Sequence, residues 1–241
     1  MDKSRRCYNP LYVSGGVDMT IIDKLNKNDV IEEDECLKLR KLKPEDRADF
    51  FRVLKQVSPV PEIFNLDGFE DLLWKETISS NTEMTLAIEK KGADADTAAG
   101  QPACQTETVE SGPAPISGEE KKNKTAYVGE CMVKNPEPGI LELGVDVGTE
   151  YQNRGIGTRA MRLLITGIRQ RCPGCRLIAR IYSDNAKSIH IIRKLGGMKI
   201  AEEPGEYKEA AAVAAAAGRQ SKPSSPGLPG SVHIEVFEIL P

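Results

Sequence analysis

The chain predicts a mixed α/β domain, built on a mixed, mostly antiparallel sheet with helices on both faces. Two observations support this fold class. Three strand-like segments in the middle of the chain are joined by turns rather than helices, so we expect them to be antiparallel. A strand, a helix and a further strand then follow in order, and such a crossover joins parallel strands.

The totals of the chain limit both its size and its partners. Its 241 residues suit one medium domain, or a core domain with tails and insertions. The net charge of −3 predicts no nucleic-acid partner, because no domain-wide basic excess exists. The sequence has no run of about 18 apolar residues, so we expect no membrane-spanning helix. We expect a cytoplasmic protein with six reduced cysteines.

Three polar or low-complexity segments flank or interrupt the pattern. Residues 1–35 are polar and irregular, and we expect an N-terminal tail of unknown role. The folded domain is expected over 36–241. Residues 91–124 and 208–231 contain few large apolar side chains, so they cannot offset their ordering entropy. We expect both to be disordered insertions within the domain.

The first half of the domain reads as strand, helix, helix and strand. A strand is expected at 37–42, and Pro44 with the acids after it marks a helix start. Spacing predicts that this helix buries Ala48, Phe51, Leu54 and Val57. A second helix is expected near 68–78, and a strand at 84–88.

The second half begins with strands at 125–134 and 140–147. An amphipathic helix follows, with its apolar face expected on Ala160, Leu163, Leu164, Gly167 and Ile168. A strand at 176–182, a helix at 185–195 and strands at 198–201 and 233–240 complete the order. The Cys-Pro-Gly-Cys stretch at 172–175 lies between a helix and a strand, and we interpret it as a loop connector.

The segment from Gln152 to Thr158 joins a strand to a helix through a glycine-bearing turn. Free backbone N–H groups and the positive end of the helix dipole make such a turn a phosphate site. A dinucleotide-binding turn requires a third glycine, and a nucleoside-triphosphate loop requires a lysine between Gly157 and Thr158. A plain tight turn is the alternative.

Two motifs resemble the GNAT superfamily of acyl-CoA-dependent N-acyltransferases. Gln152-Asn153-Arg154-Gly155-Ile156-Gly157 matches the family pattern Gln/Arg-x-x-Gly-x-Gly/Ala. The stretch from Asn185 to Gly197 matches the second family block, except that Gly197 stands where Phe is usual. The element order also fits this family.

The resemblance implies acetyl-CoA as the acyl donor, with no metal. The backbone N–H groups of the turn would receive the pyrophosphate, and glycines there allow close approach. Arg154 and Arg159 would add positive charge. The pantetheine arm would pair with the strand before the turn. The expected donor-binding residues are Leu143, Gly144, Val145, Val147, Gln152, Asn153, Arg154, Gly155, Ile156, Gly157, Thr158, Asn185 and Ser188.

Acetyl transfer requires a free amine, so a base is expected near the donor. Glu142 is the first candidate, from its place on the strand leading to the turn, and Asp146 is the second. Many family members carry a Tyr acid in the second block, where this chain has Ile192. An apolar residue there is common in the branch that acetylates N-termini of ribosomal proteins, which this chain resembles most in pattern.

The resulting hypothesis is an N-acetyltransferase that moves an acetyl group directly onto a primary amine. The acceptor would be a small molecule or a protein N-terminus or lysine, and the protein a monomer or homodimer. The alternative is a catalytically silent acyl-CoA-binding or regulatory domain, favoured by the missing Tyr. Asn185 either contacts the donor or caps its helix, and His190 is expected on the surface.

Overall fold

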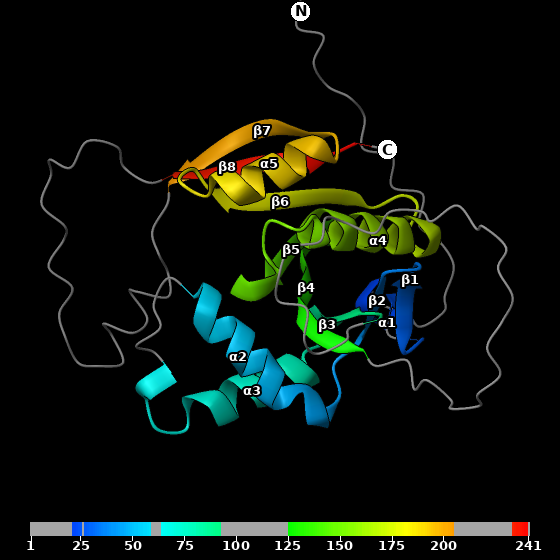
Figure 1. The fold of residues 1–241 in the computed structure, drawn as a ribbon. Coiled ribbons are helices and arrows are strands. Elements are labelled where there is room, and N and C mark those ends of the chain that lie inside the picture. Colours follow the sequence, from blue (N-terminus) through cyan, green and yellow to red (C-terminus); the bar gives the residue numbers. More distant parts are fainter. Residues whose placement is uncertain (1–20, 26, 59–63, 93–124, 205–232, 241) are drawn as a thin grey trace, which may run out of the picture.

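The strands of the described residues form an eight-stranded sheet, with the strand order β1-β2-β3-β4-β5-β6-β8-β7 (Figure 1). The computed structural model describes residues 21–25, 27–58, 64–92, 125–204 and 233–240. Only β5 and β6 are parallel within this sheet, and all its other neighbours are antiparallel. The strands are β1 (Val30–Glu33), β2 (Leu37–Lys41), β3 (Glu83–Lys90), β4 (Ala126–Glu137), β5 (Ile140–Val147), β6 (Arg176–Tyr182), β7 (Gly197–Pro204) and β8 (His233–Ile239).

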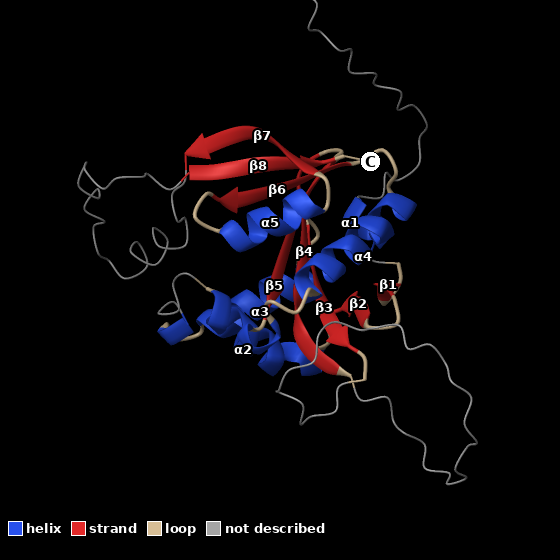
Figure 2. Ribbon diagram, turned by 45° about the horizontal axis from the view of Figure 1, so that its top comes forward, coloured by secondary structure: helices blue, strands red, loops and turns tan. Residues whose placement is uncertain are grey.

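Helices cover both faces of the sheet, which confirms the predicted fold class (Figure 2). None of the helices in the described ranges combines the length and apolar character needed to cross a bilayer. The helices are α1 (Ile21–Leu25), α2 (Arg47–Val57), α3 (Phe69–Ser79), α4 (Ile156–Arg171) and α5 (Ala186–Lys194), with 3-10 turns η1 (Pro44–Asp46) and η3 (Thr149–Tyr151).

The described part of the segment 1–35 is not a tail. Ile22 and Leu25 of α1 and Ile31 of β1 are almost fully buried in the main core. Strand β1 pairs with β2 and forms one edge of the sheet. The pattern was missed because these two elements are short and are separated by polar residues. The expected insertions fall almost entirely on residues 93–124 and 205–232, outside the described residues.

The main core lies between the sheet and helices α4 and α5. Helix α4 buries the predicted apolar face, including Ala160, Leu164 and Ile168. The expected loop connector at 172–175 is confirmed, because Cys172 ends α4 and its carbonyl accepts the N–H of Cys175 at 3.2 Å. Strand β6 then begins at Arg176.

A smaller core lies on the opposite face of the sheet, between the sheet and helices α2 and α3. Helix α2 buries Phe50, Phe51 and Val53 there. The predicted helical face was therefore wrong in part, because Ala48 is exposed and Leu54 is only half-buried. The helix starts one turn later than Pro44 suggests, since residues 44–46 form the 3-10 turn η1. The buried face of α2 is centred on Phe50, Phe51 and Val53.

A buried ion pair holds α2 in place on the sheet. Arg40 of β2 donates to both carboxylate oxygens of Asp46, at 2.6 and 2.8 Å, and to Glu89 of β3 at 2.7 Å. The Asp46 carboxylate also accepts the N–H of Lys43. This network sets where α2 crosses β4 and β5, and that position matters for the candidate site.

Strands β5 and β6 diverge after a short paired region. They pair only from Ile140 to Glu142 on β5 and from Arg176 to Ile178 on β6. Beyond that point β5 continues beside β4, while β6 continues beside β8. Figures 1 and 2 show β4 and β5 running across the direction of β6, β8 and β7. Residues 143–147 of β5 therefore have no paired residue on β6, and this break in strand pairing is called the opening below.

Candidate functional site

The turn between β5 and α4 presents backbone donors to this opening. Asn153 and Gly155 have positive φ values of 59° and 76°, in the turn just before α4 begins at Ile156. Among the described residues, no backbone acceptor bonds the N–H groups of residues 153–158. A helix N-terminus with free donors and a positive dipole end binds anions. The geometry therefore fits a phosphate group.

The two glycines of this turn have different roles. A Cβ on Gly155 would meet nothing within 4 Å, so this glycine is required by its φ of 76°. A Cβ on Gly157 would lie 3.2 Å from Ile191 Cδ1 and 3.6 Å from Val147 Cγ2. Gly157 therefore serves the packing of α4 against α5 and β5. This contact was not visible in the sequence, because it joins distant segments.

The two arginines expected beside the phosphates also differ. Arg159 is held by Asp34, at 2.5 Å, and by Glu35, both in the turn between β1 and β2. Its guanidinium ties α4 to that turn. Arg154 is exposed, and the described residues provide it with no ion-pair partner. Of the two, Arg154 is the cation available to a ligand at the turn.

The two sequence motifs meet in space. Gln152 Nε2 donates to the Val147 carbonyl at 3.0 Å, and Gln152 Oε1 accepts from Lys187 Nζ at 3.0 Å. Gln152 thus ties the turn to the end of β5 and to the start of α5. At the same end of α5, Asn185 Oδ1 accepts the N–H of Ser188 at 3.1 Å. Asn185 is therefore a helix cap.

Residues 143–147 line the opening with their backbone. The Leu143 side chain is buried in the main core, so any contact it makes with a ligand in the opening is through its backbone. Gly144 is tightly packed, since a Cβ there would lie 2.9 Å from Met132 Cε. Val145 and Val147 are half-buried. An extended ligand can pair with this strand as a further strand would.

The first candidate base, Glu142, is already engaged. Its Oε2 accepts from Arg180 Nη1 at 2.6 Å, and Arg180 also bonds Glu203 at 3.2 Å. Glu142 lies at the last paired position of β5, at the closed end of the opening. Asp146 lies four residues further along β5, within the open part. The structure therefore separates the two candidates by position.

Sequence reasoning missed Glu130, a buried carboxyl in the middle of β4. Its exposed fraction is 1%, and it lies directly opposite Asp146 in the β4–β5 register. Burial, and then the charge of Asp146, raise the pKa of Glu130 to about 8. A sequence signal existed, because an acidic residue inside the apolar stretch 127–133 is unusual for a central strand.

Two further positions behave as the sequence indicated. Ile192 is 3% exposed and belongs to the main core, so its side chain packs and offers no proton. His190 is exposed on α5.

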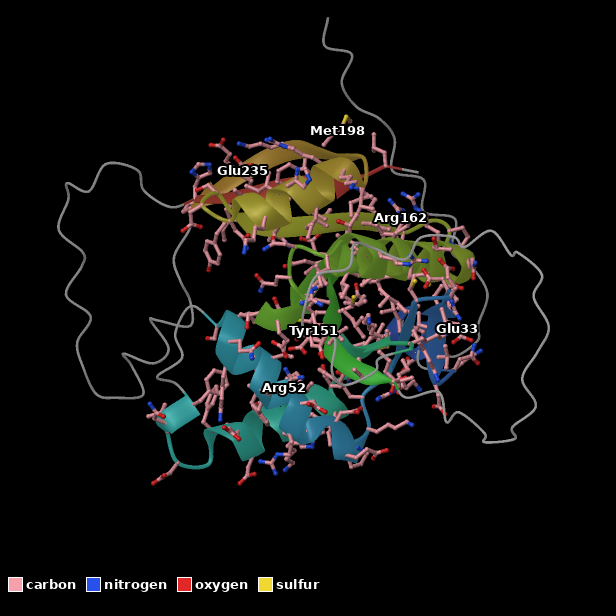
Figure 3. The ribbon with its side chains drawn as sticks, in the orientation of Figure 1. Glu33, Arg52, Tyr151, Arg162, Met198 and Glu235 are labelled. Atoms are coloured by element: carbon pink, nitrogen blue, oxygen red, sulfur yellow. The ribbon has the colours of Figure 1, made fainter. Side chains whose placement is uncertain are left out.

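Helix α2 reaches the site through Arg52, which donates to Glu150 at 2.5 Å and to the Tyr127 carbonyl at 3.1 Å. Figure 3 labels Arg52 on α2 and Tyr151 near the end of β5.

Solved structures share this fold. A GNAT-family acetyltransferase from Bacillus anthracis matches with a TM-score of 0.54 and 12% identity, covering 87% of this chain and 97% of its own. The spermidine/spermine N-acetyltransferase SpeG from Vibrio cholerae, in complex with manganese ions, matches with a TM-score of 0.52 and 12% identity, covering 85% and 92%. At such identities the likeness shows the fold alone.

The family is shown by sequence. The family model described as an acetyltransferase (GNAT) domain matches residues 37–198, which is more than half of the chain. No curated protein sequence matches the chain. The matched range contains β2 through α5, both motifs and the opening between β5 and β6. The chain therefore belongs to the GNAT acetyltransferase family and is an N-acetyltransferase.

Proposed function

We propose that the protein transfers an acetyl group from acetyl-CoA directly onto a primary amine. The observation that carries the proposal is the opening between β5 and β6, together with the turn after β5 whose N–H groups at the start of α4 have no backbone acceptor among the described residues. A thioester with a long polar arm and a pyrophosphate suits both parts. The arm would follow residues 143–147, and the pyrophosphate would meet residues 153–158.

The expected donor-binding residues fall into two groups in this proposal. Asn153, Arg154, Gly155, Ile156 and Thr158 would bind through the turn, mostly with backbone N–H groups. The others would act by position. Leu143, Gly144, Val145 and Val147 form the strand. Gln152 and Gly157 hold α5 against the turn, and Asn185 caps α5 by accepting the N–H of Ser188. The thioester supplies the acetyl group that is transferred to the amine, and the reaction requires no metal.

Direct attack by the amine is supported by the placement of the thiols. Cys131 is fully buried, and burial followed by the charge of Glu130 raises the pKa of its thiol above the usual range. Cys172 and Cys175 lie at the far end of α4, more than four helical turns from the phosphate turn. Cys131, Cys172 and Cys175 are therefore not placed to act as a thiol nucleophile beside the opening.

Asp146 is the better placed of the two candidate bases. Glu142 lies at the closed end of the opening, where Arg180 pairs with it, and Asp146 lies on the part of β5 that is not paired with β6. We propose that Asp146 accepts the proton of the acceptor ammonium, and that Glu142 orients Arg180 at the closed end. Asp146→Asn should then lower kcat at least 100-fold, within the range for a general base. Glu142→Gln should lower it less.

The acceptor is proposed as a cationic amine, either a small molecule or a protein N-terminus or lysine. The neighbour SpeG is a spermidine/spermine acetyltransferase, which makes polyamines a first choice. The apolar Ile192 matches the branch that acetylates ribosomal-protein N-termini. We propose that the protein acts in the cytoplasm as a monomer or homodimer, with neither nucleic acid nor membrane as a partner.

The reaction is tested by measuring coenzyme A release with a thiol reagent. The panel contains spermidine, spermine, lysine-containing peptides and peptides with free N-termini. Turnover with at least one amine supports the proposal, and the best amine identifies the acceptor class. Tight acetyl-CoA binding without turnover on any amine would favour the silent acyl-CoA-binding domain instead.

The donor site is tested with two glycine variants that carry the same backbone strain. Gly155 and Gly139 have φ values of 76° and 81°, and a Cβ on either meets nothing within 4 Å. Gly155→Ala should weaken acetyl-CoA binding measured by calorimetry. Gly139→Ala, at the turn between β4 and β5, should leave it unchanged. Equal affinities in both variants would contradict the phosphate site.

A further inference from the structure

The carboxyl of Glu130 is completely enclosed and only half satisfied. Its Oε2 accepts from Tyr127 Oη at 2.9 Å. Its Oε1 is buried and has no hydrogen-bond partner among the described residues. A buried carboxylate oxygen without a donor is costly, whereas a protonated oxygen is not charged. The proton of a neutral Glu130 therefore belongs on Oε1, because Oε2 already accepts from tyrosine.

The group that faces Glu130 across the strands is Asp146. Directly opposed residues in an antiparallel pair have Cβ atoms about 4.5–5.5 Å apart. Two neighbouring carboxyl groups do not both ionise readily, and the charge of Asp146 raises the pKa of Glu130. Glu130 is the buried member, and Asp146 is half-buried beside the opening. Asp146 therefore ionises first, and Glu130 is the second of the two to lose its proton.

The other elements around Glu130 contribute charges of both signs. From α2, the positive charge of Arg52 lowers the pKa of Glu130, as does the hydrogen bond from Tyr127 on β4 itself. Asp146 on β5 raises it. Opposite on β3, Ala87 carries no charge. The negative charges of Asp46 and Asp49 help to raise the pKa of Tyr127, after burial and Glu130. Glu150 forms an ion pair with Arg52.

Resting on the proposed function above, we propose that Glu130 and Asp146 form a coupled carboxyl pair in which Asp146 meets the acceptor amine and Glu130 is a positioning residue. Glu130 keeps the proton of the pair, so Asp146 remains a carboxylate and attracts the ammonium. Asp146 then takes one proton from the ammonium. The nitrogen lone pair forms the C–N bond and the C–S bond breaks. One of the two protons still on the nitrogen passes to the departing thiolate, and the other stays on the amide product.

Ionisation of Glu130 adds a second negative charge beside Asp146, which makes Asp146 a stronger base. The dependence of kcat/KM on pH should therefore contain a step near the pKa of Glu130, in addition to the titration of the amine. Tyr127 lowers the pKa of Glu130, so Tyr127→Phe should move the step to higher pH. Glu130→Gln should abolish it, because glutamine does not titrate.

The test compares the wild type with Glu130→Gln, Tyr127→Phe and Glu142→Gln between pH 6 and 9.5. Glutamine can still accept the Tyr127 hydrogen bond through its oxygen, so the packing is retained, and circular dichroism checks the fold. We expect the step to be lost only in Glu130→Gln and retained in Glu142→Gln. A Glu130→Gln profile that superimposes on the wild type, or a step that disappears in Glu142→Gln, would overturn the proposal.

An infrared difference spectrum gives a readout that does not depend on turnover. At pH 7 the wild type should show the carbonyl band of a protonated carboxyl that titrates with the step, and Glu130→Gln should lack it. Its absence from the wild type would overturn the carboxyl pair whatever the activity. A band present in a protein that acetylates no amine would instead count against the proposed function.

Discussion

Glu130→Gln should raise the free energy of unfolding, and the gain should grow with pH. In the folded protein burial and the charge of Asp146 raise the pKa of Glu130 to about 8, while the ordinary value is 4.5. The folded state therefore holds this proton more tightly than the unfolded state. By proton linkage, the stability of the wild type falls as the pH rises from 4.5 towards 8. Glutamine carries no charge and escapes this loss.

The size of the effect follows from the same two values. Each pH unit above 4.5 costs the wild type ~1.4 kcal/mol until the folded pKa is reached. The gain of the glutamine variant should therefore be less than about 1 kcal/mol at pH 5. At pH 7 it should be about 3 kcal/mol, and above pH 8 it should level off near ~5 kcal/mol. Because Glu130 is only 1% exposed, solvent screening does not reduce this difference in the free energy of unfolding.

Urea unfolding followed by circular dichroism at pH 5, 7 and 9 measures these differences. Glu142→Gln is the matched control, because its carboxylate is partly exposed and paired with Arg180. Removing that pair should lower stability by no more than about 1 kcal/mol, the usual range for accessible ion pairs. A difference between Glu130→Gln and the wild type that stays constant from pH 5 to 9 would refute the reasoning.

Three other predictions follow from contacts in the structure. Asp46→Asn should lower the free energy of unfolding by about 3–5 kcal/mol in urea titrations, because it leaves Arg40 buried without its main partner; the exposed Asp71→Asn should cost less than ~1 kcal/mol. Gly129→Ala should lower Tm and kcat together, since its Cβ would lie 2.2 Å from the Asp146 carbonyl; unchanged kcat would separate the β4–β5 contact from catalysis. Arg154→Gln should weaken acetyl-CoA binding in calorimetry by about fivefold, equivalent to ~1 kcal/mol, whereas Arg159→Gln should leave it nearly unchanged because Asp34 and Glu35 already hold that guanidinium.

The sequence by itself determined the fold class and the family. Periodic apolar positions located most strands and helices, and the glycine turn from Gln152 to Thr158 located the N-terminus of α4, where the phosphate site is proposed. These are local features. Hydrophobic periodicity and turn chemistry depend on residues within about one helical turn, so they can be read along the chain.

Only the tertiary structure decided which polar groups are used internally and which are free. Arg159 and Glu142 resemble functional residues in the sequence, yet Asp34 and Arg180 hold them. Gly157 resembles a ligand contact, yet it accommodates Ile191. Glu130 carries no motif, and its importance depends on burial and on Asp146 across the sheet. Ion pairing, burial and strand register arise between distant segments, and a single sequence does not record them.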